Sequence, residues 1–236
     1  MRRRVFSLRA VPVCLVFLLA GCNDDPPPTG GESPGTTTTA PAPAAKAYLR
    51  GAQLTQDARS VDFVVNGAAL ATGIDYGGFG PYAELDPGEY RIQFFPEGDR
   101  GAALIETRVT LGSNQAVTLA VVGLPLSTLA IFEERSTRSD RARLKMVNTV
   151  PDFPAPFDLA IQSGPGIFGG IGYLQTSGFA ELIPGVYGFE LRRGGTAEEL
   201  ATISGEGLSA GANYSAYAIG TLSRDDIELL VIRDSF

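Results

Sequence analysis

One eight-residue motif, Ala-Glu-Leu-x-Pro-Gly-x-Tyr, occurs twice in this chain, at residues 83–90 and 180–187. Pro followed by Gly suits the two central positions of a type II turn, because Pro presets φ and Gly accepts a positive φ. Apolar and polar residues then alternate along residues 90–94 and 187–192. The motif therefore predicts one turn followed by one half-buried strand, present in two copies.

The similarity between the two copies extends well beyond this motif. Tyr76 and Tyr173 stand 97 positions apart, as do the two Pro-Gly pairs, whereas Leu49 and Leu144 stand 95 positions apart. An offset that changes only between strand-like segments indicates loops of different length within one repeated fold. The chain is therefore read as two copies of one domain.

Short apolar segments, separated by Gly, Pro, Asn and Asp, make up each copy, and no segment shows a sustained helical period. Segments 117–122 and 216–219 are apolar on both faces, as central strands are. We therefore predict an all-β chain with two tandem immunoglobulin-like antiparallel β-sandwich domains, at residues 47–135 and 141–236.

The first residues, 1–21, resemble the signal peptide of a bacterial lipoprotein. A basic start is followed by an apolar segment that is shorter than the ~20 residues of a membrane-spanning helix, and then by Leu-Ala-Gly-Cys ending at Cys22. The resemblance implies cleavage before Cys22, a palmitate-type lipid on its thiol, and a place in the bacterial cell envelope. Asn23 is not the aspartate of an inner-membrane retention signal, which favours the outer membrane, on its periplasmic or its exposed face. An ordinary secretory signal with a chance cysteine is the alternative.

Residues 22–46 are rich in Pro and Thr and contain almost no large apolar side chain. Such a segment cannot bury enough surface to offset the entropy lost on ordering, so it is predicted to be a disordered linker. In polyproline II conformation it would reach roughly 75 Å. Its predicted role is to hold the domains away from the membrane that the lipid on Cys22 enters.

The composition excludes several kinds of chemistry. The chain has no His and two Cys, of which Cys14 leaves with the signal peptide and Cys22 carries the lipid. Triads with His or Cys and the usual zinc sites are therefore excluded. The formal net charge of −7 becomes more negative once the basic start is removed, which argues against a nucleic-acid partner. Acidic pairs such as Glu133-Glu134 and Asp225-Asp226 lack the spacing of a calcium loop, so we expect no metal and no cofactor.

Several motifs together resemble the domain of unknown function 4397 (DUF4397), a family of bacterial secreted and lipid-anchored proteins. The second copy has Arg-Leu-Lys-Met-Val-Asn at 143–148, Phe-Asp-Leu at 157–159, and Gly-x-x-Tyr-x-x-x-Ala-x-Gly at 211–220. The first copy resembles the family less closely, through Asp62 and the Pro-Gly pair. The resemblance implies a β-sandwich and a surface location for both domains, and it brings no catalytic residues.

Two Gly-rich loops with aromatic residues, 73–82 and 163–173, are the candidate binding segments. Such loops combine tight backbone paths with side chains that bury large areas. Tyr76 and Tyr173 are equivalent in the two copies, so they are interpreted first as structural anchors at the end of each sandwich. The residues without an equivalent in the other copy are the candidate ligand contacts, namely Phe79, Phe168 and Ile171.

Repeated acids have two interpretations. Asp62 and Asp158 lie between apolar neighbours in the same strand of each copy, where a carboxylate either meets a ligand or, as we favour, accepts backbone hydrogen bonds at a corner of the sheet. The overall prediction is a non-enzymatic, lipid-anchored envelope protein that binds an envelope protein or glycan, or acts as a structural or adhesive spacer. The alternative is a polysaccharide-active enzyme with a carboxylate pair ~5–9.5 Å apart, for which the repeat offers Glu84 with Asp86, and Glu181.

Overall fold

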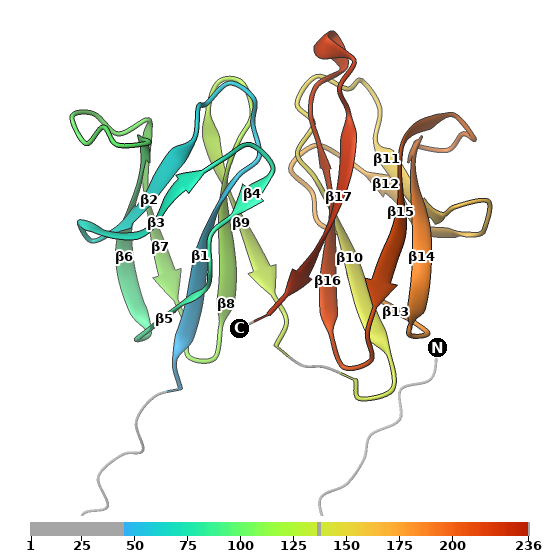
Figure 1. Cartoon of the computed structure of the whole chain (residues 1–236), viewed down its shortest axis with the longest axis horizontal. Coiled ribbons are helices and arrows are strands. Elements are labelled where there is room, and N and C mark those ends of the chain that lie inside the picture. Colours follow the sequence, from blue (N-terminus) through green and yellow to red (C-terminus); the bar gives the residue numbers. More distant parts are fainter. Residues whose placement is uncertain (1–44, 136–137, 236) are drawn as a thin grey trace, which may run out of the picture. The chain divides into compact units, whose positions relative to one another are not determined.

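A computed structural model describes residues 45–135 and 138–235 (Figure 1). Within these residues the chain forms four β-sheets, arranged as two sandwiches of two sheets each. The all-β prediction and the prediction of two sandwiches are confirmed. The predicted signal peptide, Cys22 and nearly all of the predicted linker lie outside the described residues. No helix of the described part is both long and apolar enough to cross a membrane.

The first sandwich contains nine strands. They are β1 (Ala47–Gln53), β2 (Val61–Val65), β3 (Ala68–Ile74), β4 (Gly78–Phe79), β5 (Ala83–Leu85), β6 (Gly88–Pro96), β7 (Ile105–Leu111), β8 (Ala116–Val122) and β9 (Ser127–Glu133). One sheet has the order β4-β1-β8-β9, with β5 also paired to β1, and the other has the order β3-β2-β6-β7.

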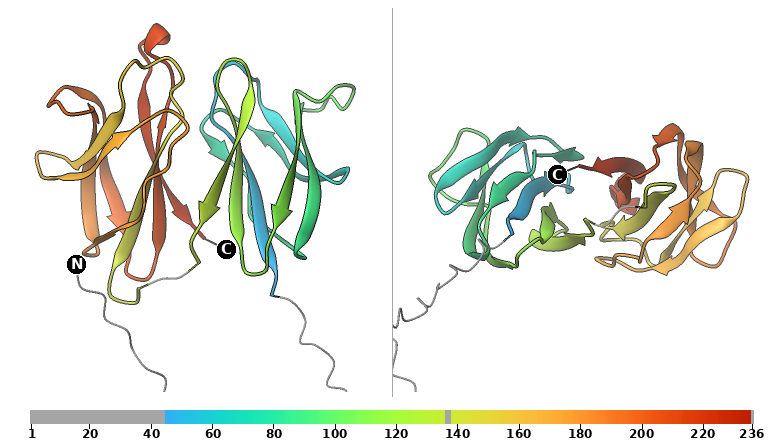
Figure 2. Two further views of the ribbon diagram at one scale, coloured as in Figure 1. Left: turned by 180° about the vertical axis from the view of Figure 1, so that it is seen from behind. Right: turned by 90° about the horizontal axis from the view of Figure 1, so that it is seen from below.

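The second sandwich repeats this plan. Its strands are β10 (Ala142–Asn148), β11 (Phe157–Ile161), β12 (Gly166–Ile171), β13 (Ala180–Leu182), β14 (Gly185–Arg193), β15 (Glu199–Leu208), β16 (Asn213–Ile219) and β17 (Glu228–Asp234). The sheets have the orders β13-β10-β16-β17 and β12-β11-β14-β15. A single 3₁₀ turn, η1 (Leu222–Arg224), lies between β16 and β17. Figure 2 shows the two sheets of each sandwich from two further directions.

One pair of strands in each sandwich is parallel, which the antiparallel prediction did not include. Leu49 of β1 lies beside Val117 of β8, and Leu144 of β10 lies beside Tyr214 of β16, in parallel register. Parallel neighbours need a long connection, and the strands between β1 and β8 supply it. Alternation of apolar residues identifies a strand and its buried face, but it carries no information on strand direction.

Two of the predicted loops contain strands. Strand β3 ends inside the segment 73–82, where β4 also lies, and β12 occupies the middle of the segment 163–173. Each of β3 and β12 is the edge of its sheet and pairs on one side only, with β2 and β11 respectively. Edge strands that consist largely of Ala and Gly lack the alternation of branched side chains that identifies a strand in the sequence.

Neither repeated Pro-Gly pair forms the predicted type II turn. Gly88 has a φ of 159°, far from the value near +80° that such a turn requires, and Gly185 is not among the glycines with positive φ. Both glycines already begin strands, pairing with Leu111 and Leu208. The following Tyr fixes the corner instead, since the Tyr90 hydroxyl donates to the backbone carbonyl four residues earlier over 2.6 Å, and Tyr187 does the same.

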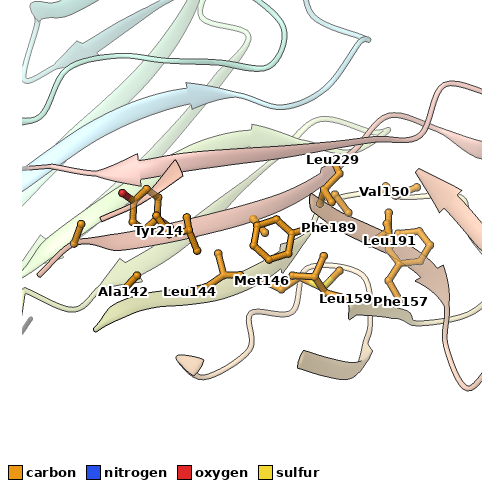
Figure 3. Packing of buried hydrophobic residues seen from close by; sticks show 14 residues of the cluster. Ala142, Leu144, Met146, Val150, Phe157, Leu159, Phe189, Leu191, Tyr214 and Leu229 are labelled. Atoms are coloured by element: carbon orange, nitrogen blue, oxygen red, sulfur yellow. The ribbon is translucent and has the colours of Figure 1, made fainter. Parts of the chain in front are cut away.

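Each sandwich encloses its own apolar core. In the first, the rings of Phe63 and Phe94 lie 5.1 Å apart between the two sheets. In the second, buried side chains from β10, β11, β14 and β16 fill the space between the sheets, Phe157 and Phe189 among them (Figure 3). Strands β8 and β16 are buried on both faces, because their outer faces meet in a third apolar cluster that both sandwiches share.

Candidate functional site

The two repeated aspartates hold backbone amides. Asp62 accepts hydrogen bonds from the N–H groups of Gly73 at 3.0 Å and Gly98 at 3.3 Å. Asp158 accepts them from Gly170 at 2.7 Å and Gly195 at 2.8 Å. Each carboxylate thus fastens an edge strand and a neighbouring turn to the central strand of its sheet. This is the structural role that we favoured from the sequence.

The surroundings of the two aspartates differ. Arg100 forms an ion pair with Asp62 over 3.3 Å, and its guanidinium lies 5.3 Å from the centre of the Phe95 ring. In the second sandwich Arg192 lies directly opposite Asp158 in the register of β11 and β14. Arg192 nevertheless forms its ion pair with Glu190, at 2.5 Å.

A surface hollow lies beside each of the predicted binding segments. The first has a volume of about 430 Å³ and lies along β3 and β4, with Asp75, Phe79 and Pro81 among its lining residues. The second has a volume of about 310 Å³ beside β12, and its lining is Asp158, Ala160, Gly166, Ile167, Phe168, Gly169, Arg192 and Thr196. Ligand pockets have volumes from roughly 300 Å³ upward, so both are large enough for a small molecule or a side chain.

The three candidate ligand contacts are half-buried side chains that pack within the protein. The ring of Phe79 lies 4.9 Å from that of Tyr217 and 4.9 Å from the guanidinium carbon of Arg50. Phe168 and Ile171 pack against the core of the second sandwich. These side chains therefore have a structural role, and ligand binding by them stays a prediction.

The equivalent tyrosines have different environments. Tyr76 packs against the apolar cluster shared by the sandwiches, and burial raises the pKa of its hydroxyl to about 12. Tyr173 is 39% exposed, although its hydroxyl lies close to Gly123 of the first sandwich, where an added Cβ would be 2.4 Å away. The anchor interpretation fits Tyr76 better than Tyr173.

A buried polar cluster joins the two sandwiches, and we call it the seam. Arg50 of β1 pairs with Asp234 of β17 over 2.7 Å, and Lys145 of β10 pairs with Glu133 of β9 over 2.5 Å. All four side chains are at most 5% exposed. Each sandwich therefore supplies one base and one acid to the other, from equivalent strands.

Two hydroxyl groups complete the hydrogen bonds of the seam. Thr118 of β8 accepts from the Arg50 Nε at 2.8 Å and donates to Glu133 at 3.0 Å. Ser215, the equivalent residue of β16, donates to Asp234 at 2.7 Å. Burial, with Glu133 nearby, raises the pKa of Asp234 to about 6, against the opposite effect of Arg50. Burial likewise raises the pKa of Tyr217 well above its ordinary value.

The sequence predictions missed this seam. From the sequence, Glu133 was considered only as part of an acidic pair without the spacing of a calcium loop, whereas its side chain is buried in an ion pair. The described residues contain no group of three acids, Cys or His that could hold a metal ion. A signal was present in the sequence. Arg50 and Lys145 are polar residues at equivalent positions of β1 and β10, and Thr118 and Ser215 are polar residues at equivalent positions of the largely apolar strands β8 and β16.

The acids that the enzyme alternative invoked lie elsewhere, on exposed positions. Glu84 accepts from the Tyr48 hydroxyl at 3.2 Å, Asp86 pairs with Lys46 at 2.8 Å, and Glu181 lies 3.4 Å from Arg138. None of the three lines either of the two hollows described above.

Three solved structures resemble the fold. The Bacillus anthracis TIE protein is 13% identical over 75% of this chain, with a TM-score of 0.27, and the matched part is 34% of that protein. The carbohydrate-binding module CBMbc (family CBM26) of Eubacterium rectale Amy13K, solved with maltoheptaose, is 10% identical over 81% of this chain and 98% of its own, with a TM-score of 0.26. A candidate cell adhesion protein from Bacteroides fragilis is 11% identical over 82% of this chain and 98% of its own, with a TM-score of 0.21.

A search of curated proteins finds no match to this chain. Among protein families, the model described as "Domain of unknown function (DUF4397)" matches residues 47–160. The match covers the first sandwich and continues to β11 of the second, and no second match to this family is found. The sequence resemblance had been placed mainly on residues 141–236, so its extent is corrected. The DUF4397 model therefore matches one segment of the chain, residues 47–160.

Proposed function

We propose that this protein is a non-enzymatic, lipid-anchored component of the bacterial cell envelope, which binds an envelope protein or glycan through its tandem sandwiches. The seam is the observation that carries this proposal. Four buried charges and a shared apolar cluster join the two sandwiches, so their loops and hollows belong to one compact unit. A binding protein benefits from such rigidity, because less entropy is lost when a preorganised surface meets its partner.

The second sandwich is proposed to be a diverged copy of the DUF4397 domain. Apart from the additional strand β4 of the first sandwich, its strand orders match those of the first sandwich, including the parallel central pair. The aspartate that fastens the edge strand and the tyrosine that fixes the corner also occupy equivalent positions. These repeated features support a common origin of the two sandwiches, although the sequence match to the family ends at residue 160.

Lipid anchoring rests on the resemblance of residues 1–21 to a lipoprotein signal. The test is metabolic labelling with a palmitate analogue in cells that produce the whole chain or its Cys22→Ala variant. We expect labelling and cleavage of the wild type, and an unlabelled, uncleaved precursor from the variant. Equal labelling of both would remove the anchor from the proposal.

Binding is tested with the mature chain as bait in crosslinked envelope preparations, followed by titration of each captured protein or glycan in purified form. The proposal expects at least one saturable interaction. Variants on the two hollows, and a seam variant that keeps its fold, then identify the surface in contact. If no envelope component binds in purified form, the structural or adhesive spacer becomes the favoured role.

The alternative, a polysaccharide-active enzyme, has one observation in its favour. A third hollow of about 360 Å³ is lined by two acids, Glu97 and Asp99, beside Arg59 and Ser60. One of them is already occupied in part, since Asp99 accepts from the Gly101 N–H at 2.8 Å. Release of reducing ends from envelope polysaccharides by the wild type, and its loss in Glu97→Gln, would favour this alternative.

A further inference from the structure

An acid and a base face each other in the second sandwich without forming an ion pair. Asp158 and Arg192 are direct partners across β11 and β14, and opposite charges in such positions normally interact. Here the Nε and Nη2 of Arg192 donate to Glu190 at 3.0 and 2.5 Å, while both oxygens of Asp158 accept backbone N–H groups. Both side chains line the hollow of about 310 Å³ beside β12.

This hollow is open because the residues around it are small. Ala160 contributes to its lining, and the adjacent edge strand presents Gly166 and Gly169. A Cβ added at Gly166 would have no atom within 4 Å. In the first sandwich larger side chains occupy the equivalent place, because Phe95 stands opposite Asp62 and Arg100 contacts both.

The polar groups of the hollow are held in fixed positions. Two backbone N–H groups orient the Asp158 carboxylate, whose oxygens keep lone pairs for further donors. Glu190 orients the Arg192 guanidinium and leaves its Nη1 as a donor. The hydrogen bond from the Ser163 N–H, with Arg192 beside it, lowers the pKa of Glu190, so that this carboxylate stays charged. Fixed donors and acceptors lose little entropy when they bind a ligand.

The charges select the class of ligand. The charges of Asp158, Glu190 and Arg192 sum to −1, so an anion is disfavoured, and a cation gains from Asp158 only where it avoids the Arg192 guanidinium on the neighbouring strand. A neutral group that both donates and accepts meets neither penalty. Neighbouring hydroxyl groups of a sugar ring can donate to Asp158 and accept from Arg192, while the half-buried Ile167 offers an apolar contact to the C–H groups of the ring.

We propose that the hollow between Asp158 and Arg192 is a binding site for a neutral saccharide, and that the first sandwich has no equivalent site. The inference rests on the proposed binding function and specifies its ligand class and its location. Asp158 therefore has two roles, since the carboxylate that fastens β12 also receives the ligand hydroxyl groups.

The test is a titration of the isotope-labelled mature chain with maltose, cellobiose and N,N′-diacetylchitobiose as neutral probes, and with glucuronate and methylammonium as charged ones. We expect saturable shifts of the Gly169, Gly170 and Gly195 amide signals with at least one neutral probe. The amides of Gly73 and Gly98, which hold the equivalent aspartate of the first sandwich, should not shift.

Gly166→Val places a side chain at the wall of the hollow without a backbone clash, and it should weaken binding at least about tenfold. Gly207→Val is the matched control, because a Cβ there also has no atom within 4 Å and the residue lies on β15, outside the lining of this hollow. The control should bind as the wild type does. Comparable melting temperatures of both variants would exclude unfolding as the cause.

Three results would overturn the proposal: no saturation by any neutral probe, equal affinity of Gly166→Val and wild type, or tighter binding of a charged probe. Each would leave the proposed function standing if the mature chain still binds an envelope partner through another surface. Failure of all binding, by saccharides and by envelope components alike, would remove both.

Discussion

The two sandwiches share one structural feature, an aspartate that accepts hydrogen bonds from two backbone N–H groups, and they differ in the side chains that surround it. Asp62 and Asp158 each fasten two backbone amides, yet Asp62 is buried and bridged by Arg100, whereas Asp158 is half-buried beside a hollow. The repeated hydrogen bonds maintain the fold in both copies. The difference lies in side chains that the fold does not require, and this is where a duplicated domain can acquire a binding site while its partner copy remains structural.

The largest expected effect tests whether the sandwiches contribute equally to the seam. Lys145→Met leaves Glu133 buried without its base, and Arg50→Met does the same to Asp234, so each should lower the free energy of unfolding by about 3–5 kcal/mol. Chemical denaturation measures both. Lys46→Met, which removes an exposed ion pair with Asp86, is the control and should leave the free energy of unfolding nearly unchanged. A small effect of either seam variant would show that the two ion pairs do not contribute equally to stability.

The next effect separates the two aspartates. Asp62→Ala leaves two partly buried N–H groups without an acceptor and should cost about 2–3 kcal/mol. Asp158→Ala should cost about 1 kcal/mol less, because the amides of Gly170 and Gly195 are exposed and water can replace the carboxylate. Urea unfolding with matched m-values provides the measurement. Equal costs would mean that the hollow does not change the environment of Asp158.

A smaller effect concerns pH. The pKa of Asp234 is raised to about 6 in the folded protein, from 3.8, so its contribution to stability is complete below pH 3.8 and is lost as pH rises through 6. Between pH 5 and pH 8 this group alone should lower the free energy of unfolding by about 1.4 kcal/mol. The chain has no His to obscure the trend. In Asp234→Asn the slope should be lost, and an unchanged slope would assign it to another group.

The smallest effect should be the same in both copies. Tyr90→Phe and Tyr187→Phe each remove one hydroxyl that donates to a backbone carbonyl over 2.6 Å. Each should cost about 1 kcal/mol in thermal or chemical unfolding. A much larger cost in one sandwich would show that the corner supports more of that domain than its hydrogen bond indicates.

Much of the fold could be predicted from the sequence, because alternation and turn residues report directly on half-buried strands. The segments around β6 and β14 are examples, with their repeated Tyr and apolar residues. Strands β3 and β12 could not be predicted in the same way. They consist largely of small residues, and pairing with β2 and β11 rather than intrinsic preference holds them extended.

The candidate site was predicted in part. The segments 73–82 and 163–173 do border hollows, but the aromatic residues chosen for them pack inward. An aromatic beside Gly has the same sequence signature whether it faces a ligand or a core, so only the pairing of β4 and β12 decides its direction. Asp158 and Arg192 also face each other only because of the register between β11 and β14, and the sequence of a single strand does not specify that register.

The exchange of charges across the seam has a consequence for the fate of the protein under proteolysis. Arg138, between β9 and β10, is exposed and offers a cleavage point to trypsin-like enzymes. A cut there would break the chain while the ion pairs and the shared apolar cluster still hold the halves. The nicked protein should elute from gel filtration as one particle and separate into two fragments only in denaturant. If the chain is anchored through Cys22 as proposed, the second domain would then stay at the membrane after its covalent link to the anchor was lost.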